Sequence, residues 1–284
     1  MLIVNQLSLF SFLLAFAGAL YFALGVRFWK SRWSESGALP LSVRVIRVEK
    51  FLVGMTMVIH ATGLQGLLFG QGGMQFSFAL AFCLMAWLAV LIYWLESFQV
   101  RLDGIQPIVL LSAALAAFLP LIFPNTHTVA HIGALSFRFH LLVTMLACGF
   151  FALAVAHAIF MGLLERRLHS PSRVSSRRIG NMPPLLALEA LLFRILNIAF
   201  VLLTLALGSG FLYSEEIFGR ALTFDHKTVF GVLSWLIFAI LLIGRHIYGW
   251  RGRRALNWTI AGFCALLLAY IGKQFVLEVL LGRA

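Results

Sequence analysis

The sequence predicts an all-α integral membrane protein, a polytopic bundle of about eight transmembrane helices, and three observations predict this class. Of the 284 residues, 62% are hydrophobic and only 11% are charged, whereas a soluble domain is usually about a quarter charged. Eight apolar stretches are long enough to cross a bilayer as helices, which takes about 20 mostly apolar residues. The basic residues gather in four clusters that alternate with loops nearly empty of Lys and Arg.

Each apolar stretch is expected to form one helix, because lipid offers no partner to open backbone groups and the alternating pattern of a membrane barrel is missing. The eight expected spans are 8–26, 51–69, 76–97, 105–123, 138–164, 191–213, 228–248 and 256–280. No soluble domain fits between them. We expect one membrane domain with a five-span front half at 1–169, a polar linker at 170–184 and a three-span back half at 185–284.

The placement of the basic residues predicts the orientation in the membrane. The clusters comprise Arg27, Lys30, Arg32, Arg44, Arg47 and Lys50 in the first loop, Arg101 in the third, Arg166, Arg167, Arg173, Arg177 and Arg178 in the fifth, and Arg245, Arg251, Arg253 and Arg254 at the close of the seventh span. By the positive-inside rule these loops are cytoplasmic and both termini are extracytoplasmic. The net charge of +12 therefore indicates topology and contact with anionic membrane lipid, not nucleic acid. The expected location is the bacterial cytoplasmic (inner) membrane.

Motifs of enzymes and of metal sites are missing. Cys83, Cys148 and Cys264 all lie inside spans, form no CxxC pair and are expected to be small apolar fillers. No P-loop, GxGxxG, HExxH or GxSxG stands in a usable context. The first span lacks the positive start of a cleaved signal. We therefore expect no catalytic residues and no enzyme activity.

One passage interrupts the apolar pattern of the back half. It reads GFLYSEEIFGRALTFDHKTVFGVLSW at 210–235, and its charged and aromatic part at 214–227 joins the sixth span to the seventh. The predicted topology makes this part an extracytoplasmic hairpin. On composition alone, an aromatic belt with ordinary loop charges explains it.

The order of residues in this passage resembles the tryptophan-rich haem-binding segment of the cytochrome c assembly family of membrane proteins. That segment reads, loosely, G-x-x-W-A-x-E-x-W-G-R-x-W-G-W-D-P-K-E-x-W, followed by a span containing T-W-L-I-Y-A-I. Without a gap, the matching positions are Gly210, Tyr213, Glu216, Phe218, Gly219, Arg220, Phe224, Asp225, Lys227 and Phe230. SWLIFAI at 234–240 then matches the span, and GWRGRRA at 249–255 and AYIG at 269–272 resemble the family's end. The likeness covers the back half well and the front half weakly.

This chain also departs from the family's pattern. Every tryptophan of the segment itself is replaced, by Tyr213, Phe218, Leu222, Phe224 or Phe230, and His226 stands where the family has proline. The haem-exporting members carry a second outer histidine after the last span, and the ending LLGRA has none. The likeness is therefore closest to the HemX-like and YpjD-like branch, eight-span relatives with a degenerate signature.

The resemblance implies haem as a cofactor at the outer face. Iron takes one or two axial ligands, and neutral imidazole suits it. His140 opens the fifth span in a segment that resembles the family's outer-histidine segment, and His226 begins the seventh span at the same depth. We expect the two to approach one iron from opposite sides; alternatively, each simply caps its helix at the interface. The implied surroundings are aromatic walls from Tyr213, Phe218 and Phe224, the signature carboxylate Asp225, and Arg138, Arg220 and Lys227 for the propionates.

Two further histidines lie inside the expected spans. His60 is ~15 Å and His157 ~12 Å from the cytoplasmic ends of their spans at 1.5 Å per residue. Ionisable residues at such depth are costly and usually functional, so both are candidate haem ligands. The segment VIHATGL around His60 also resembles the second span of the branch. The structural alternative is a neutral histidine bonded to a neighbouring carbonyl.

Two functions are compatible with these residues. One is a haem-binding protein that delivers or senses haem at the extracytoplasmic face during cytochrome c assembly, with other maturation proteins or another inner-membrane protein as partners. The other is a haem-free membrane adaptor or regulator, of haem biosynthesis or of another membrane protein, that retains the fold. A solute transporter is a weaker third reading, since no span is broken by a Gly/Pro pair at mid-membrane.

Overall fold

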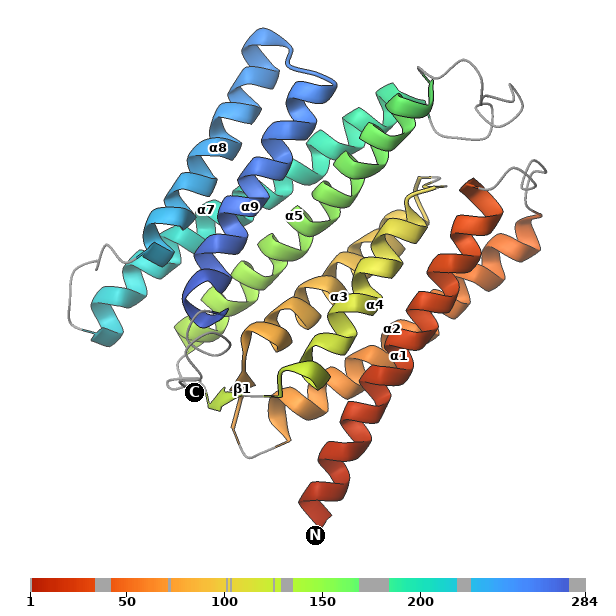
Figure 1. Cartoon of the computed structure of the whole chain (residues 1–284). Helices are drawn as coiled ribbons and strands as arrows, with labels where there is room; N and C mark the ends of the chain where they lie inside the picture. The colour runs from red at the N-terminus through yellow and green to blue at the C-terminus, as the bar shows by residue number, and fades with distance from the viewer. Residues whose placement is uncertain are drawn as a thin grey trace.

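The described part of the computed structural model is helical apart from one small sheet (Figure 1). It comprises residues 2–33, 42–70, 73–100, 102, 104–124, 126–128, 135–168, 184–218 and 226–275. The elements are α1 (Leu2–Trp33), α2 (Val43–Phe69), β1 (Gln75–Phe76), α3 (Phe78–Glu96), α4 (Gln106–Ile122), β2 (His127–Thr128), α5 (Leu135–Leu168), α7 (Leu185–Phe218), α8 (His226–Tyr248) and α9 (Arg253–Phe275).

The prediction of an all-α membrane protein is confirmed. Each expected span falls on one helix, and six described helices are long and apolar enough to cross a membrane. The helix α4 is apolar but shorter. The chain is therefore a polytopic helical membrane protein, while the count of eight spans and the side on which the termini lie stay predictions.

The helices form two rings of four. In the front ring α1 packs on α2 and α4, and α3 closes the ring against the same two helices. In the back ring α5 packs on α7 and α9, and α8 closes it in the same way. The main contact between the rings is the seam of α3 and α5. The predicted linker at 170–184 lies, apart from Pro184, outside the described residues, so the division that it marks stays a prediction.

Consecutive helices run antiparallel, so α1 begins and α9 ends at the same end of the bundle (Figure 1). We call this the outer end, after the predicted topology, and the opposite end, where α1, α3, α5 and α8 terminate, the inner end. Ser42 and Ser77 cap α2 and α3 by accepting backbone N–H bonds of 3.4 and 3.1 Å. Gly249 and Gly252, both with positive φ, make the short turn from α8 to α9.

The small sheet was not predicted from the sequence. It pairs β1 with β2 and so ties the loop after α2 to the loop after α4 at the outer end. The buried Gln75 side chain donates to Thr128 Oγ1 at 2.9 Å and accepts from Thr126 Oγ1 at 3.3 Å. Three polar side chains thus hold the two loops together.

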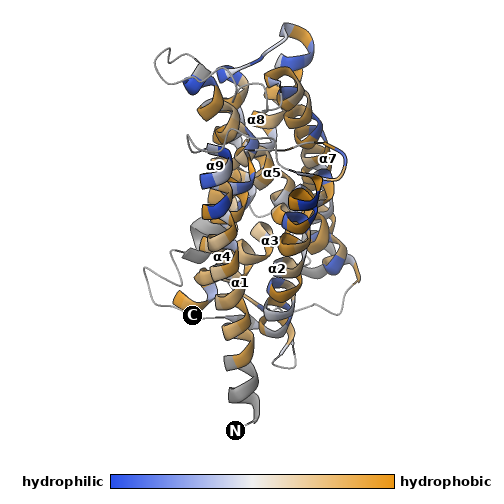
Figure 2. Ribbon diagram, turned by 90° about the vertical axis from the view of Figure 1, so that its right-hand side faces the viewer, coloured by the Kyte–Doolittle hydropathy of each residue, from blue (hydrophilic) through white to orange (hydrophobic). Residues whose placement is uncertain are grey.

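The surface of the bundle is that of a membrane protein. Figure 2 shows an apolar ribbon over most of the helices, with many of the hydrophilic residues in its upper half. Several polar side chains inside the helices donate to the carbonyl four residues earlier, which lowers their cost in lipid. These bonds run from Thr56 to Leu52, Thr62 to Val58, Asn197 to Phe193, Thr204 to Phe200 and Thr259 to Ala255.

Candidate functional site

His140 occupies the second turn of α5 at the outer end and is held against α7. Its Nδ1 lies 2.9 Å from Ser209 Oγ, and the Ser209 hydroxyl itself donates to the Ala206 carbonyl at 3.1 Å. Because that hydroxyl proton is engaged, Ser209 Oγ accepts and His140 Nδ1–H donates. The neutral ring then carries its lone pair on Nε2, the tautomer in which a histidine ligates a metal.

Gly210 lies directly against the His140 ring. A Cβ atom built on Gly210 would be 3.2 Å from His140 Cε1, which is closer than an ordinary van der Waals contact. Gly210 is also the first glycine of the haem-binding signature that the sequence resembles. The structure therefore brings His140 together with the start of that signature, which the sequence alone did not place in contact.

The first turn of α8 completes the described part of this region. Lys227 interacts electrostatically with His140. Its neighbour His226 is exposed, and the His226 ring lies 6.2 Å from that of Phe230. The approach of His140 and His226 to one iron stays a prediction.

Only some of the remaining residues predicted for the outer site belong to the described part of the structure. Arg220, Phe224 and Asp225 lie outside the described residues. Tyr213 and Phe218 belong to the last turns of α7, and their side chains are outside the described part. Arg138 lies in the first turn of α5 with an exposed side chain.

His60 is fully buried between α1, α2 and α3. Its Nε2 lies 3.0 Å from Cys83 Sγ, and its ring meets the Tyr21 ring edge-on with centroids 5.6 Å apart. Neither His60 Nδ1 nor the Tyr21 hydroxyl has a hydrogen-bond partner among the described residues. Cys83, predicted to be an apolar filler, is thus the polar partner of His60.

His157 is likewise fully buried, on α5. Its Nδ1 lies 3.0 Å from the Leu153 carbonyl, so Nδ1–H donates and the lone pair is on Nε2. That Nε2 atom is buried and has no partner among the described residues. The tautomer suits a ligand, but the nitrogen is enclosed by side chains.

Haem fits these four histidines unequally. An axial ligand must offer its nitrogen to an iron at the centre of a flat macrocycle, which needs an open face. His140 and His226 reach the surface of the bundle, whereas His60 and His157 have no exposed area. Haem binding at His60 or His157 would need neighbouring helices to separate. Within the described residues no group of three His, Cys, Asp or Glu side chains is placed to hold a metal ion; haem iron needs only one or two ligands.

Ser209 was missed by the reading of the sequence. Its only signal is its position directly before Gly210, the first matched residue of the signature. Cys83 gave no signal, because its pairing with His60 depends on how α2 and α3 pack.

Sequence comparisons with known proteins indicate the family of this chain. The sequence model described as "Cytochrome C assembly protein" matches residues 55–281, a range that includes all four histidines. The chain is 31% identical over 171 residues to "Inner membrane protein YpjD" of Escherichia coli strain K12, across 60% of this chain and 62% of YpjD. It is 36% identical over 89 residues to "Cytochrome c biogenesis protein CcsA" of Prochlorococcus marinus strain MIT 9515, across 31% of this chain and 28% of CcsA.

The match thus spans less than two thirds of either relative, and the YpjD likeness is the more extensive one. Together with the apolar helices, it makes this chain a multi-pass inner membrane protein. The family match covers most of the sequence and includes the signature-like passage at 210–235. The chain therefore belongs to the cytochrome c assembly protein family, in a YpjD-like branch.

Proposed function

We propose that this protein binds haem at its outer end and delivers or senses it during cytochrome c assembly. The observation that carries the proposal is the setting of His140, whose Nδ1–H is fixed by Ser209 and whose ring lies against Gly210. The hydrogen bond orients the ring and sets its tautomer, which is how proteins prepare a histidine to ligate a metal. Family membership supplies the general link to cytochrome c biogenesis.

Each residue has a defined part in this proposal. His140, through Nε2, and His226 would hold the haem iron. Lys227, whose charge acts on His140, would pair with a propionate. Haem, when bound, supplies the iron porphyrin that a cytochrome c requires. The protein's task is to bind, orient and release it, and the residues proposed here make and break no covalent bond.

The second candidate is a haem-free adaptor or regulator. Two observations favour it: the signature has lost its tryptophans, and His60 and His157 are enclosed in packed helices. In that case the passage at 210–235 is a structural remnant of the family's haem segment. Its exposed part would then serve as a contact surface for another membrane protein.

An absorbance spectrum of the purified protein tests the proposal. We expect a Soret band and low-spin features after expression with haem supply or after addition of haemin. His140→Ala is expected to abolish the band, and His226→Ala to abolish it or convert it to a high-spin spectrum. The matched control is His246→Ala, which removes an exposed histidine of α8 at the inner end and is expected to leave the spectrum unchanged.

The adaptor candidate makes the opposite prediction. No Soret band would appear in the native protein even with excess haemin, although the protein inserts and remains folded. A band that survives His140→Ala and His226→Ala but disappears in His60→Ala or His157→Ala would instead place haem inside the bundle.

A further inference from the structure

A pocket of about 310 Å³ opens at the inner end of the front ring, far along the chain from the signature. It lies between α1, α2, the end of α3 and the turn that leads to α4. Its volume is at the lower end of the range for small-molecule sites. Its lining combines aromatic, aliphatic and charged side chains, so it suits an amphiphilic ligand.

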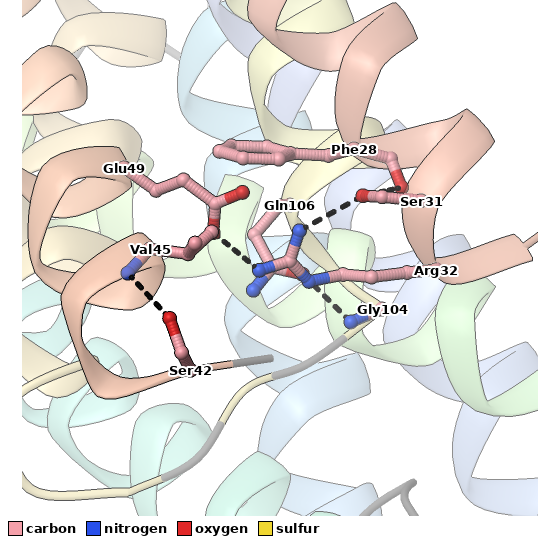
Figure 3. Close-up of polar contacts among 8 residues, drawn as sticks. All are labelled: Phe28, Ser31, Arg32, Ser42, Val45, Glu49, Gly104 and Gln106. Atoms are coloured by element: carbon pink, nitrogen blue, oxygen red, sulfur yellow. Dashed lines mark hydrogen bonds and ion pairs between the residues drawn. The ribbon is translucent and has the colours of Figure 1, made fainter. Parts of the chain in front are cut away.

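One wall of the pocket is a buried ion pair. Arg32 Nη2 lies 2.7 Å from Glu49 Oε2, and the two side chains are only 7% and 6% exposed. The Arg32 guanidinium also lies 4.7 Å from the centre of the Phe28 ring and donates to Ser31 Oγ (Figure 3). Behind it, Gln106 Oε1 accepts from the Gly104 backbone N–H at 2.6 Å. This wall is fixed before any ligand arrives.

Lys50 adds a positive charge that the Arg32–Glu49 wall does not neutralise. Its Nζ donates to the Ser97 carbonyl at 2.5 Å and lies 4.6 Å from the centre of the Phe98 ring. An ammonium has three N–H donors, and the contacts within the described residues use one of them. Because Arg32 already engages Glu49, the described lining keeps one net positive charge, at Lys50.

The rim of the pocket is apolar and exposed. Val43 is 71% exposed and Phe98 is 58% exposed, and both line the pocket. Trp94 packs edge-on against Phe98 with ring centroids 4.9 Å apart, and its Nε1–H donates to the Lys50 carbonyl at 2.9 Å. At the predicted cytoplasmic interface such a rim faces the lipid glycerol and acyl region. A small free anion would make no contact with these apolar side chains, whereas the acyl chains of a lipid would cover them.

We propose that this pocket binds an anionic phospholipid of the inner leaflet, with the headgroup phosphate at Lys50 and the start of the acyl chains on Val43 and Phe98. The Arg32–Glu49 pair positions Lys50 by holding α1 and α2 together and does not itself contact the phosphate. The site is specific, unlike the diffuse attraction of a basic loop to an acidic membrane. It does not depend on haem, so its failure and the failure of the proposed haem function are separate results.

The test titrates dioctanoyl phosphatidylglycerol into the detergent-solubilised full-length protein and measures bound lipid by native mass spectrometry. Losing one charge-assisted hydrogen bond is expected to weaken binding about tenfold in Lys50→Gln. The matched control is Arg47→Gln, which removes an equal charge from an exposed position three residues earlier on α2 that does not line the pocket. It is expected to change binding less than twofold on the general scale of surface charge effects.

A second variant tests the cavity without changing the charge. Ile46→Phe adds volume inside the pocket and is expected to weaken binding while Lys50 remains. Equal affinities of Lys50→Gln and Arg47→Gln, or native affinity in both pocket variants, would overturn the proposal. Inorganic phosphate that competes as well as the lipid would overturn the lipid assignment and identify a site for a free anion. Equal binding of dioctanoyl phosphatidylcholine would remove the requirement for net negative charge and overturn it as well.

Discussion

The two ends of the bundle are held together by different chemistry. Five ion pairs between described residues lie toward the inner end: Arg32–Glu49, Arg194–Glu96, Arg245–Glu189, Arg251–Glu189 and Arg253–Glu165. Four of them join two helices, and Arg251 lies in the turn between α8 and α9. At the outer end, Gln75 makes neutral hydrogen bonds with two threonines and His140 makes one with Ser209. The charge of Lys227 also acts on His140 there. Ion pairs thus hold the helices together at the inner end, and the candidate site lies at the outer end.

The basic clusters therefore have a structural role in addition to the one predicted from the sequence. From the sequence they indicate topology and lipid contact. In the structure, Arg32, Arg245 and Arg253 also engage glutamates of neighbouring helices. Ligand-binding elements are commonly the less stable parts of a protein. We infer that the ion pairs of the inner end stabilise the two rings. The outer end is then the less stable end, where the helices can move to admit and release a ligand.

The largest effect concerns the sides of the membrane. A reporter fused after Ala284 and one inserted in the 214–227 hairpin are both expected to report the extracytoplasmic side, and one in the 170–184 linker the cytoplasm. The reason is the distribution of Lys and Arg among the loops. The signals of a periplasm-active and a cytoplasm-active reporter at each position measure this. The reverse pattern would exchange the two ends and place the candidate site in the cytoplasm.

The next largest effect concerns the strength of the inner end. Glu49→Gln removes the buried carboxylate that faces the Arg32 guanidinium, so we expect a loss of about 3 kcal/mol in the free energy of unfolding. The matched control is Glu165→Gln, whose partner Arg253 is 69% exposed, and there we expect less than about 1 kcal/mol. Denaturant unfolding in detergent measures both. Equal losses would mean that burial does not distinguish these pairs.

The fold was largely predictable from the sequence because hydropathy and charge placement carry most of the information about membrane spans. The stretch at 138–164, for example, lies within α5, and the family was identified from the order of residues at 210–235. The ion pairs were not predictable. Arg32 and Glu49 are 17 residues apart on separate helices, and nothing in one sequence selects Glu49 over the other carboxylates.

The residues of the candidate site could be predicted from the sequence, but the contacts between them could not. His140 and Gly210 were each identified from the resemblance, but their contact depends on how α5 packs against α7. The predicted depth of His60 in the membrane stays a prediction, and its bond to Cys83 depends on side-chain packing. Single-sequence patterns give the depth of a residue in the membrane and seldom its neighbour.

The strength of the outer end is tested at its small sheet. Gln75→Ala removes the side-chain bonds to Thr126 and Thr128, so we expect a loss of about 1–2 kcal/mol in the free energy of unfolding. Gln65→Ala, on an exposed face of α2, is the control and is expected to change little. The same denaturant assay serves. A loss equal to that of Glu49→Gln would remove the difference in strength between the two ends.

The smallest effect tests the contact on which the outer site depends. A methyl group at Gly210 would press on the His140 ring at 3.2 Å, whereas one at Gly208, two residues earlier on α7, would meet no atom within 4 Å. Alanine favours a helix over glycine by about 1 kcal/mol, so Gly208→Ala is expected to be neutral or stabilising. In Gly210→Ala the crowding offsets that gain, and we expect the two variants to differ by about 1 kcal/mol in the free energy of unfolding.

Haem binding is expected to distinguish Gly210→Ala from Gly208→Ala as well. If His140 is a ligand, displacing its ring by a few tenths of an ångström is expected to shift the Soret band or weaken haem binding in Gly210→Ala, with the native spectrum kept in Gly208→Ala. If the Gly210 variant loses stability but keeps the native spectrum and haem affinity, the close approach of α7 to α5 is only a packing contact. His140 would then be a helix-end residue bonded to Ser209, and the adaptor candidate would gain the stronger support.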